Sequence, residues 1–213
     1  MRDLINRNPI PVTVYIYKTD VAVTPGRQHE LGEMLLDHAL ADAGFSQYEK
    51  IRTKKGKPLV YASSHGADPT GRGPEICHVS LSHTPGYVVC ALCIDRPVGI
   101  DIEIIGGHRI SATQMRRTEK KLLKQAFEPE FDAALAAADE RALRDRTARF
   151  YERWTLAEAF GKMKGVGLAF SEGYDEIIAC PHETWHMENT IITVLAGGSG
   201  QERLETDRKE VSI

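Results

Sequence analysis

The seven residues VGIDIEI at positions 98–104 alternate apolar and acidic side chains and follow the turn formed by Asp95-Arg96-Pro97. Because successive side chains of a strand point to opposite faces, Asp101 and Glu103 share one face and the isoleucines share the other. Two neighbouring carboxylates repel each other unless a positive group lies between them, and Mg²⁺ binds through one or two carboxylates. The segment therefore predicts a strand whose acidic face is either a metal site or solvated.

The residues before this strand favour one helix and several further strands. We expect a helix at 26–43, because Thr24-Pro25 offers an N-cap followed by proline at the first helical position, and Gly44 offers a C-terminal cap. Residues 62–75 are rich in glycine, proline and serine and predict a loop. The expected strands are 12–17, two within 48–61 around a turn at 55–58, 76–81, and 86–95, the last two separated by a turn at 82–85.

After Gly106-Gly107 the pattern changes from strands to helices, and 148–163 is the most regular helix. The expected elements are helices at 112–127, 130–146 and 148–163, strands at 174–180 and 190–196, and a loose polar stretch at 197–213. This order predicts an α+β fold of two lobes that meet near residue 106. The N-terminal lobe is expected at 1–106, the C-terminal lobe with the most regular helix at 107–197, and a polar tail at 198–213.

Composition excludes several classes of function. The chain has 213 residues, of which 42% are hydrophobic, enough for a proper core. Lysine and arginine number 27 against 30 aspartates and glutamates, and this balance argues against a dedicated nucleic-acid binder. No apolar stretch approaches the roughly 18 residues of a membrane span, and the first residues are too polar for a signal peptide. We expect a soluble cytoplasmic protein with no membrane partner.

The four cysteines indicate a structural role. Cys90 and Cys93 have the C-x-x-C spacing of redox or zinc pairs, but they lie in YVVCALCI, which predicts a buried strand. No second Cys or His pair follows at zinc-finger spacing. We therefore expect core thiols.

The regular helix carries a second candidate constellation. Trp154, Glu158 and Lys162 are spaced i, i+4 and i+8, which stacks them on one helix face. A third carboxylate and an ammonium there would complete a metal and phosphate site. The alternative is an ordinary Glu–Lys surface pair.

Two further polar clusters are candidates for phosphate binding. Ser82-His83, in the expected turn, would offer side chains and free N–H groups to phosphate oxygens, or would simply form a polar hairpin loop. A basic set is interrupted by a turn at Gly56 and would attract a polyanion, or be a solvated charge run. This set comprises Arg52, Lys54, Lys55 and Lys57.

Taken together, these segments resemble the 4′-phosphopantetheinyl transferases, specifically the two-lobed, surfactin-synthetase-activating Sfp-type group. The resemblance runs from about residue 27 to 170, and the order and spacing of the matches make it specific. The matching segments are Ile51-Arg52, Gly56-Lys57-Pro58, HVSLSHT at 78–84, VGIDIE at 98–103 and FYERWTLAEAFGKMKGVGL at 150–168. The resemblance implies two pseudo-symmetric lobes, each a small, mainly antiparallel sheet packed with helices, in a chain that acts as a monomer.

The resemblance also implies roles for individual residues. Asp101, Glu103 and Glu158 would hold Mg²⁺ against the pyrophosphate of coenzyme A. Glu158 would also take the proton of an attacking serine, and Lys162 would steady the phosphates as a second catalytic residue. The implied coenzyme A contacts are Arg27, Arg52, Lys57, Ser82, His83 and Lys162.

The implied reaction transfers the 4′-phosphopantetheine group of coenzyme A to a serine of an acyl or peptidyl carrier protein and releases 3′,5′-ADP. Ala157 departs from the family pattern, which has lysine before the glutamate. This departure leaves open a catalytically silent coenzyme A or nucleotide-binding module. A metal phosphohydrolase would use the same carboxylates but has no reason to carry Ser82-His83 and the Gly-Lys-Pro turn. The segment 112–127 holds five basic residues against one acidic residue, and would suit an acidic carrier or be a solvated helix.

Overall fold

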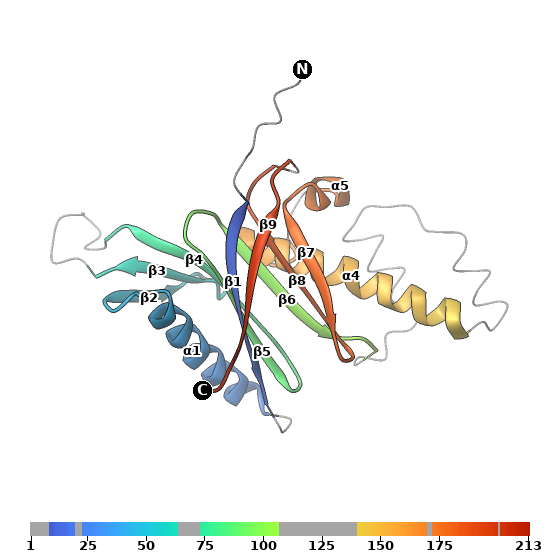
Figure 1. The fold of residues 1–213 in the computed structure, drawn as a ribbon, viewed down its shortest axis with the longest axis horizontal. Helices are drawn as coiled ribbons and strands as arrows, with labels where there is room; N and C mark the ends of the chain where they lie inside the picture. The colour runs from blue at the N-terminus through green and yellow to red at the C-terminus, as the bar shows by residue number, and fades with distance from the viewer. Residues whose placement is uncertain (1–8, 20–22, 64–72, 107–139, 170–171, 200) are drawn as a thin grey trace, which may run out of the picture.

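The structure is a computed structural model and describes residues 9–19, 23–63, 73–106, 140–169, 172–199 and 201–213. Two sheets and three helices make up this part of the chain (Figure 1). The helices are α1 (Pro25–Asp42), α4 (Glu140–Lys164) and α5 (Tyr174–Ile178). The strands are β1 (Ile10–Lys18), β2 (Tyr48–Arg52), β3 (Pro58–Ala62), β4 (Glu75–Thr84), β5 (Tyr87–Cys93), β6 (Val98–Ile104), β7 (His182–Met187), β8 (Thr190–Ala196) and β9 (Leu204–Val211).

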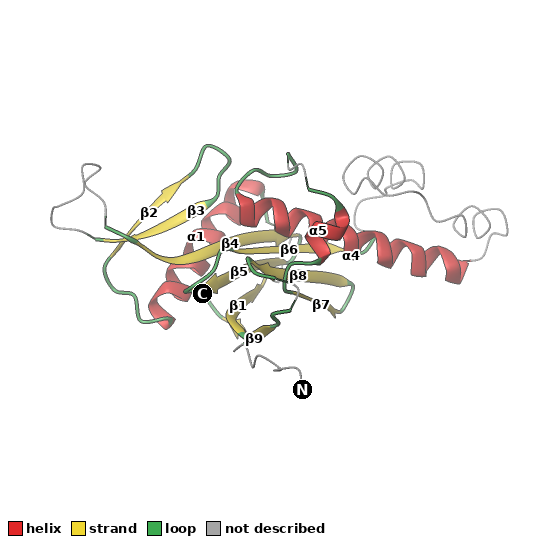
Figure 2. Cartoon of the chain, turned by 90° about the horizontal axis from the view of Figure 1, so that it is seen from above, coloured by secondary structure: helices red, strands yellow, loops and turns green. Residues whose placement is uncertain are grey.

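The strands form one six-stranded and one three-stranded sheet. Their orders are β2-β3-β4-β5-β1-β9 and β6-β8-β7, and every pairing except β1 with β9 is antiparallel. α1 packs on one face of the larger sheet, the smaller sheet packs on the other face, and α4 covers the smaller sheet (Figures 1 and 2). The expected α+β class, with two sheets packed with helices, is confirmed.

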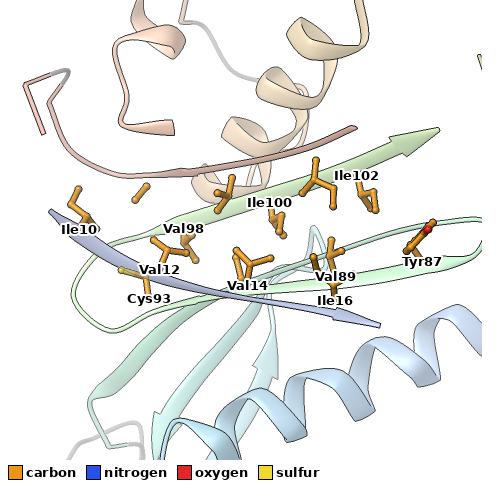
Figure 3. Packing of buried hydrophobic residues seen from close by; sticks show 14 residues of the cluster. Ile10, Val12, Val14, Ile16, Tyr87, Val89, Cys93, Val98, Ile100 and Ile102 are labelled. Carbon is orange, nitrogen blue, oxygen red and sulfur yellow. The ribbon is translucent and has the colours of Figure 1, made fainter. Parts of the chain in front are cut away.

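β5 contributes to both cores because its side chains alternate between them. Val88, Cys90 and Leu92 face α1, whereas Val89, Ala91 and Cys93 face the smaller sheet. Figure 3 shows Ile100 and Ile102 of β6 pointing into the layer between the sheets. Cys90 and Cys93 are buried, free and on opposite faces of one strand, so they are core thiols as expected.

The polar residues expected as a loose tail form an edge strand instead. β9 pairs in parallel with β1 along the whole strand, from Ile10 opposite Leu204 to Tyr17 opposite Val211. β6, expected in the N-terminal lobe, pairs with β8 in the smaller sheet. The chain thus passes from the larger sheet to the smaller one between β5 and β6, and β9 returns it to the larger sheet.

Beyond residue 139, one expected element is corrected and one further strand is found. The expected strand 174–180 is the short helix α5, where the Glu176 carboxylate accepts a hydrogen bond from the backbone N–H of Gly173 at 2.9 Å. The strand after it is β7, which the sequence pattern missed. The predicted helix 148–163 is the C-terminal part of the longer α4, while 112–127 and most of 130–146 lie outside the described residues.

α1 begins and ends where the sequence predicts. Thr24 caps the helix, because its hydroxyl accepts a hydrogen bond from the N–H of Arg27, and Gly44 has a positive φ just beyond the C-terminus. In the described part of the chain, no helix carries an apolar stretch long enough to cross a lipid bilayer.

Gly99 allows α4 to approach β6 closely. A Cβ atom at this position would lie 1.9 Å from the carbonyl oxygen of Ala159 and 2.9 Å from the backbone nitrogen of Met163. These are backbone atoms, so no side-chain rotation would relieve the overlap. The glycine therefore sets the distance between the helix and the strand that carries Asp101.

We predict that Gly99→Ala destabilises the protein by about 1–3 kcal/mol, because overpacking pushes α4 away from β6. Urea denaturation would measure the free energy of unfolding. Gly26→Ala is the matched control, since a Cβ at Gly26 meets nothing within 4 Å. Equal stability of Gly99→Ala and wild type would contradict the close packing.

Candidate active site

Two serines of β4 join the sheets beneath the site. The N–H of Ile100 donates to Ser80 Oγ at 3.1 Å, and the N–H of Ile102 donates to Ser82 Oγ at 3.4 Å. These N–H groups lie on the side of β6 that faces away from β8, so serine hydroxyls replace a neighbouring strand there. The β4–β6 junction, with Ser80 and Ser82 on one side and β6 on the other, fixes the position of Asp101.

Ser82 and His83 lie in strand β4, not in the turn expected at 82–85. Both belong to the ladder with β5, opposite Val89 and Val88. Their backbone is therefore in a regular sheet, and only the side chains can serve the site. His83 is exposed, and partial desolvation together with the Lys162 ammonium lowers its pKa.

The predicted helix face lies directly along β6. Trp154 donates its indole N–H to Glu103 at 3.2 Å, and two turns later Lys162 contacts Asp101 at 2.6 Å. Glu158 lies between them in the helix and feels the charges of Asp101 and Glu103. The structure thus brings the two predicted constellations together.

Asp101 is the most buried charged group of this cluster, with its side chain 5% exposed. One carboxylate oxygen, Oδ1, accepts from Ser82 Oγ at 2.8 Å and from Lys162 Nζ. Lys162 Nζ also donates to Ser82 Oγ at 2.7 Å, so three side chains from three elements form one closed triangle. The other oxygen, Oδ2, is buried and has no hydrogen-bond partner among the described residues.

Glu158 is easier to protonate than an ordinary glutamate. Burial and the Asp101 carboxylate raise its pKa from 4.5 to about 7, against the opposing effect of Lys162, and Glu103 adds to the rise. A carboxyl group with this pKa can hold or release a proton near neutral pH.

The carboxylates suit a divalent cation bound by oxygen. Asp101 Oδ2 has no hydrogen-bond partner among the described residues, and repulsion from Asp101 and Glu103 adds to the effect of burial in raising the pKa of Glu158. A cation among Asp101, Glu103 and Glu158 would relieve both. No three acidic, histidine or cysteine side chains of the described residues are arranged as a ready metal cage. Mg²⁺ does not require one, because it keeps several waters and uses substrate phosphates as ligands. The donor set therefore fits Mg²⁺.

A cavity of about 230 Å³ opens beside Lys162 and is rich in basic side chains. It is lined by Arg52, Lys55, Gly56, Lys57, Pro58, Ser80, Leu81, Gly161, Lys162, Gly165 and Gly167. The sequence pattern gave no reason to include Ser80 or the glycines at the end of α4. Ser80 and these glycines line the cavity because β4 and the end of α4 lie next to each other in the fold.

Several predicted contacts are already engaged within the protein. Arg52 binds the Glu33 carboxylate and donates to the carbonyl of Gly56 at 2.7 Å. Arg27 is exposed on the first turn of α1, pairs with Glu30, and does not line the cavity.

Ala157 is fully buried on α4. No ammonium therefore arises at the position where the family pattern has lysine. Lys162, a little over one turn later, supplies the positive charge beside Asp101.

A larger cavity of about 590 Å³ lies elsewhere, where β1, β5, β7 and β9 meet. Its lining includes Lys18 and Glu188, which form an ion pair, and a second carboxylate, Glu210. It lacks the excess of basic side chains found beside Lys162, so the smaller cavity is the better candidate for an anionic ligand.

We predict that Glu158 makes the stability of the protein fall as pH rises when a chelator is present. Between pH 4.5 and about pH 7, Glu158 holds a proton in the folded state and releases it on unfolding. Its contribution to stability is therefore present at low pH and is lost as the pH rises through the pKa of the folded state. Glu158→Gln should flatten this fall in the free energy of unfolding, measured in urea at about pH 5 and about pH 8. Glu205→Gln, exposed on β9, is the control. An unchanged slope in Glu158→Gln would disprove the assignment.

Comparison with known proteins agrees with this geometry. Residues 97–206, just over half of the chain, match the family model of the 4′-phosphopantetheinyl transferase superfamily. The chain is 29% identical over 143 residues to L-aminoadipate-semialdehyde dehydrogenase-phosphopantetheinyl transferase of Xenopus laevis, covering 66% of this chain and 44% of the relative. It is 27% identical over 145 residues to 4′-phosphopantetheinyl transferase psf-1 of Bacillus pumilus, covering 68% of this chain and 52% of the relative.

A shorter match, 29% identical over 92 residues, is to 4′-phosphopantetheinyl transferase Sfp of Bacillus subtilis and covers 43% of this chain and 35% of the relative. The chain thus spans about a third to a half of the length of these curated relatives. The family match includes β6 with Asp101 and Glu103, and α4 with Glu158 and Lys162. The chain belongs to the 4′-phosphopantetheinyl transferase superfamily.

Proposed function

We propose that this protein transfers the 4′-phosphopantetheine group of coenzyme A to a serine of an acyl or peptidyl carrier protein. The observation that carries the proposal is the basic cavity beside the Asp101–Lys162 pair. Family membership supports the same reaction, since the matched relatives are named as phosphopantetheinyl transferases.

The cavity suits the diphosphate of coenzyme A by charge. Arg52 and Lys55 on one side and Lys162 on the other would attract the phosphate oxygens, and the glycines of the lining allow close approach to the backbone. Ser82 and exposed His83 would contact the phosphates next to Lys162. Arg27, farther along the surface of α1, is a candidate only for the outer end of the nucleotide.

Asp101, Glu103 and Glu158 would hold Mg²⁺ between the protein and the diphosphate. Asp101 Oδ2 is the best placed donor because it is buried and has no partner among the described residues. When bound, the ion supplies positive charge that balances the phosphate oxygens. Lys162 would share this work from the other side of Asp101.

The transfer asks the protein mainly for positioning and for a proton acceptor. The serine Oγ forms a bond to the phosphorus that carries pantetheine, and the bond from that phosphorus to the bridging oxygen breaks. The bridging oxygen leaves as part of 3′,5′-ADP, and the serine proton passes to the Glu158 carboxylate. The raised pKa of Glu158 makes it a suitable acceptor near neutral pH.

We further propose that the protein acts in the cytoplasm as a monomer on an acidic carrier protein. All four cysteines are free, which fits a reducing compartment. The basic segment 112–127, proposed as the docking surface, lies outside the described residues.

We predict that wild-type protein adds the mass of phosphopantetheine to an apo carrier protein in the presence of coenzyme A and Mg²⁺. Glu158→Gln should slow this addition by at least about 100-fold, as expected for loss of a proton acceptor, and a chelator should abolish it. Intact mass spectrometry of several apo carriers would measure the product. Glu205→Gln, exposed on β9, is the control and should keep wild-type activity.

The outcomes of this experiment separate the alternatives. Coenzyme A binding without modification of any carrier would indicate a silent binding module. Release of 3′,5′-ADP without a modified carrier would indicate a hydrolase. Either result would overturn the proposed transfer.

A further inference from the structure

The C-terminus of α4 forms a tight glycine cap immediately after Lys162. The N–H of Val166 donates to the carbonyl of Gly161 at 3.1 Å, and the N–H of Gly165 donates to the carbonyl of Lys162 at 3.1 Å. Gly165 has a φ of 72°, which a residue with a side chain rarely adopts. These bonds form a Schellman motif, which satisfies two of the last carbonyls of the helix.

The carbonyl of Met163, which follows Lys162 in the last turn of α4, is bound by a side chain from the larger sheet. Lys57 Nζ donates to the Met163 carbonyl oxygen at 2.5 Å. The lysine stem lies against Gly165, where a Cβ atom would come within 3.2 Å of Lys57 Cδ. The absence of a side chain at residue 165 therefore makes room for Lys57 as well as for the cap.

The turn that carries Lys57 is itself held rigidly. Thr53 and Lys57 bind each other through two bonds, from Thr53 N–H to the Lys57 carbonyl at 2.9 Å and from Lys57 N–H to Thr53 Oγ1 at 3.1 Å. Arg52 binds the carbonyl of Gly56, as described above. A fixed turn from the larger sheet thus holds the end of the helix that covers the smaller sheet.

An ammonium group suits this position electrostatically. Helix C-termini carry partial negative charge, and a lysine that binds the last carbonyls stabilises them most when it is partly buried. Lys57 is half-buried, so its bond to Met163 is shielded from water. The contact also explains how Lys57 lines the cavity while its charge is directed at the protein backbone.

We propose that Lys57 is a positioning residue, which holds the last turn of α4 so that Lys162 stays on Asp101 and Ser82, rather than a direct ligand of the nucleotide. The inference rests on the proposed function, because it assigns how the same site is kept in order. Lys162 directly precedes Met163, so fraying of this turn would remove Lys162 from its partners. Loss of the Lys57 ammonium should therefore lower the rate of transfer more than it weakens the binding of coenzyme A.

The test uses Lys57→Met, which keeps the unbranched side chain up to the Cε position and removes the ammonium donors, and Lys57→Arg, which restores donors. Hydrogen exchange of the Gly165 and Val166 amides, measured on the full chain without coenzyme A, should become about tenfold faster in Lys57→Met. With coenzyme A and a carrier, kcat should fall about tenfold while KM for coenzyme A changes less than about threefold. Lys57→Arg should recover most of both losses.

Lys55→Met is the control for exchange, since Lys55 lines the same cavity but makes no hydrogen bond or ion pair with the described residues. A raised KM with unchanged kcat and unchanged exchange would overturn the proposal and make Lys57 a direct ligand. Faster exchange with unchanged kcat would also overturn it. If Lys57→Met fails to fold, Lys57→Gln, which removes the charge and shortens the side chain by one atom, takes its place. Because exchange needs neither substrate, it tests the capping contact even if the wild type transfers nothing, which separates this failure from that of the proposed function.

Discussion

The ion pair between the buried Asp101 carboxylate and the partly buried Lys162 ammonium is the interaction on which the site depends. Asp101 is 5% exposed, and removing such a carboxylate from water is costly unless positive charge and hydrogen bonds replace the lost hydration. Lys162 at 2.6 Å and the Ser82 hydroxyl at 2.8 Å both bind the same oxygen, Oδ1. The second oxygen, Oδ2, has no hydrogen-bond partner among the described residues and is available to a cation, as a metal and phosphate site requires.

This pair is possible only because two backbone constraints bring its elements together. Gly99 lets the backbone of α4 come directly against β6, so that a lysine on the helix reaches an aspartate on the strand. Ser80 and Ser82 bind backbone N–H groups of β6, which aligns the smaller sheet with β4. Ser82 thus has two roles, because its hydroxyl binds the backbone of β6 and also orients the Asp101 carboxylate. Packing and chemistry are coupled at this junction.

Local periodicity made part of this arrangement predictable. The alternation in 98–104 predicts that Asp101 and Glu103 share a face, and the i, i+4, i+8 spacing predicts that Trp154, Glu158 and Lys162 share another. Both rules act over a few residues and depend on the chain alone. That these two faces meet is suggested by the resemblance to the family, and the hydrogen bonds of Trp154 to Glu103 and Lys162 to Asp101 give it a physical basis.

Features that depend on distant segments could not be predicted in this way. β9 is polar and exposed at alternate positions, and it is a strand because β1, almost two hundred residues earlier, offers it a free edge. The segment 174–178 has the length and the apolar residues of a short strand. It is a helix, and the Glu176 carboxylate accepts a hydrogen bond from the N–H of Gly173 at its first turn. The sequence pattern predicts a turn at 82–85, but Ser82 lies in strand β4. Its partners, Asp101 and Lys162, come from two other elements.

The most direct test of the account is a double-mutant cycle on the free energy of unfolding with Asp101→Asn, Lys162→Met and the double variant. Each single change leaves the other charged group at a poorly hydrated position, so we predict that the double variant is more stable than the sum of the single effects, by at least about 1 kcal/mol. Additive effects, within about 0.5 kcal/mol, would contradict the account, because Asp101 and Lys162 would then be independent and the site would lack the pair that organises it.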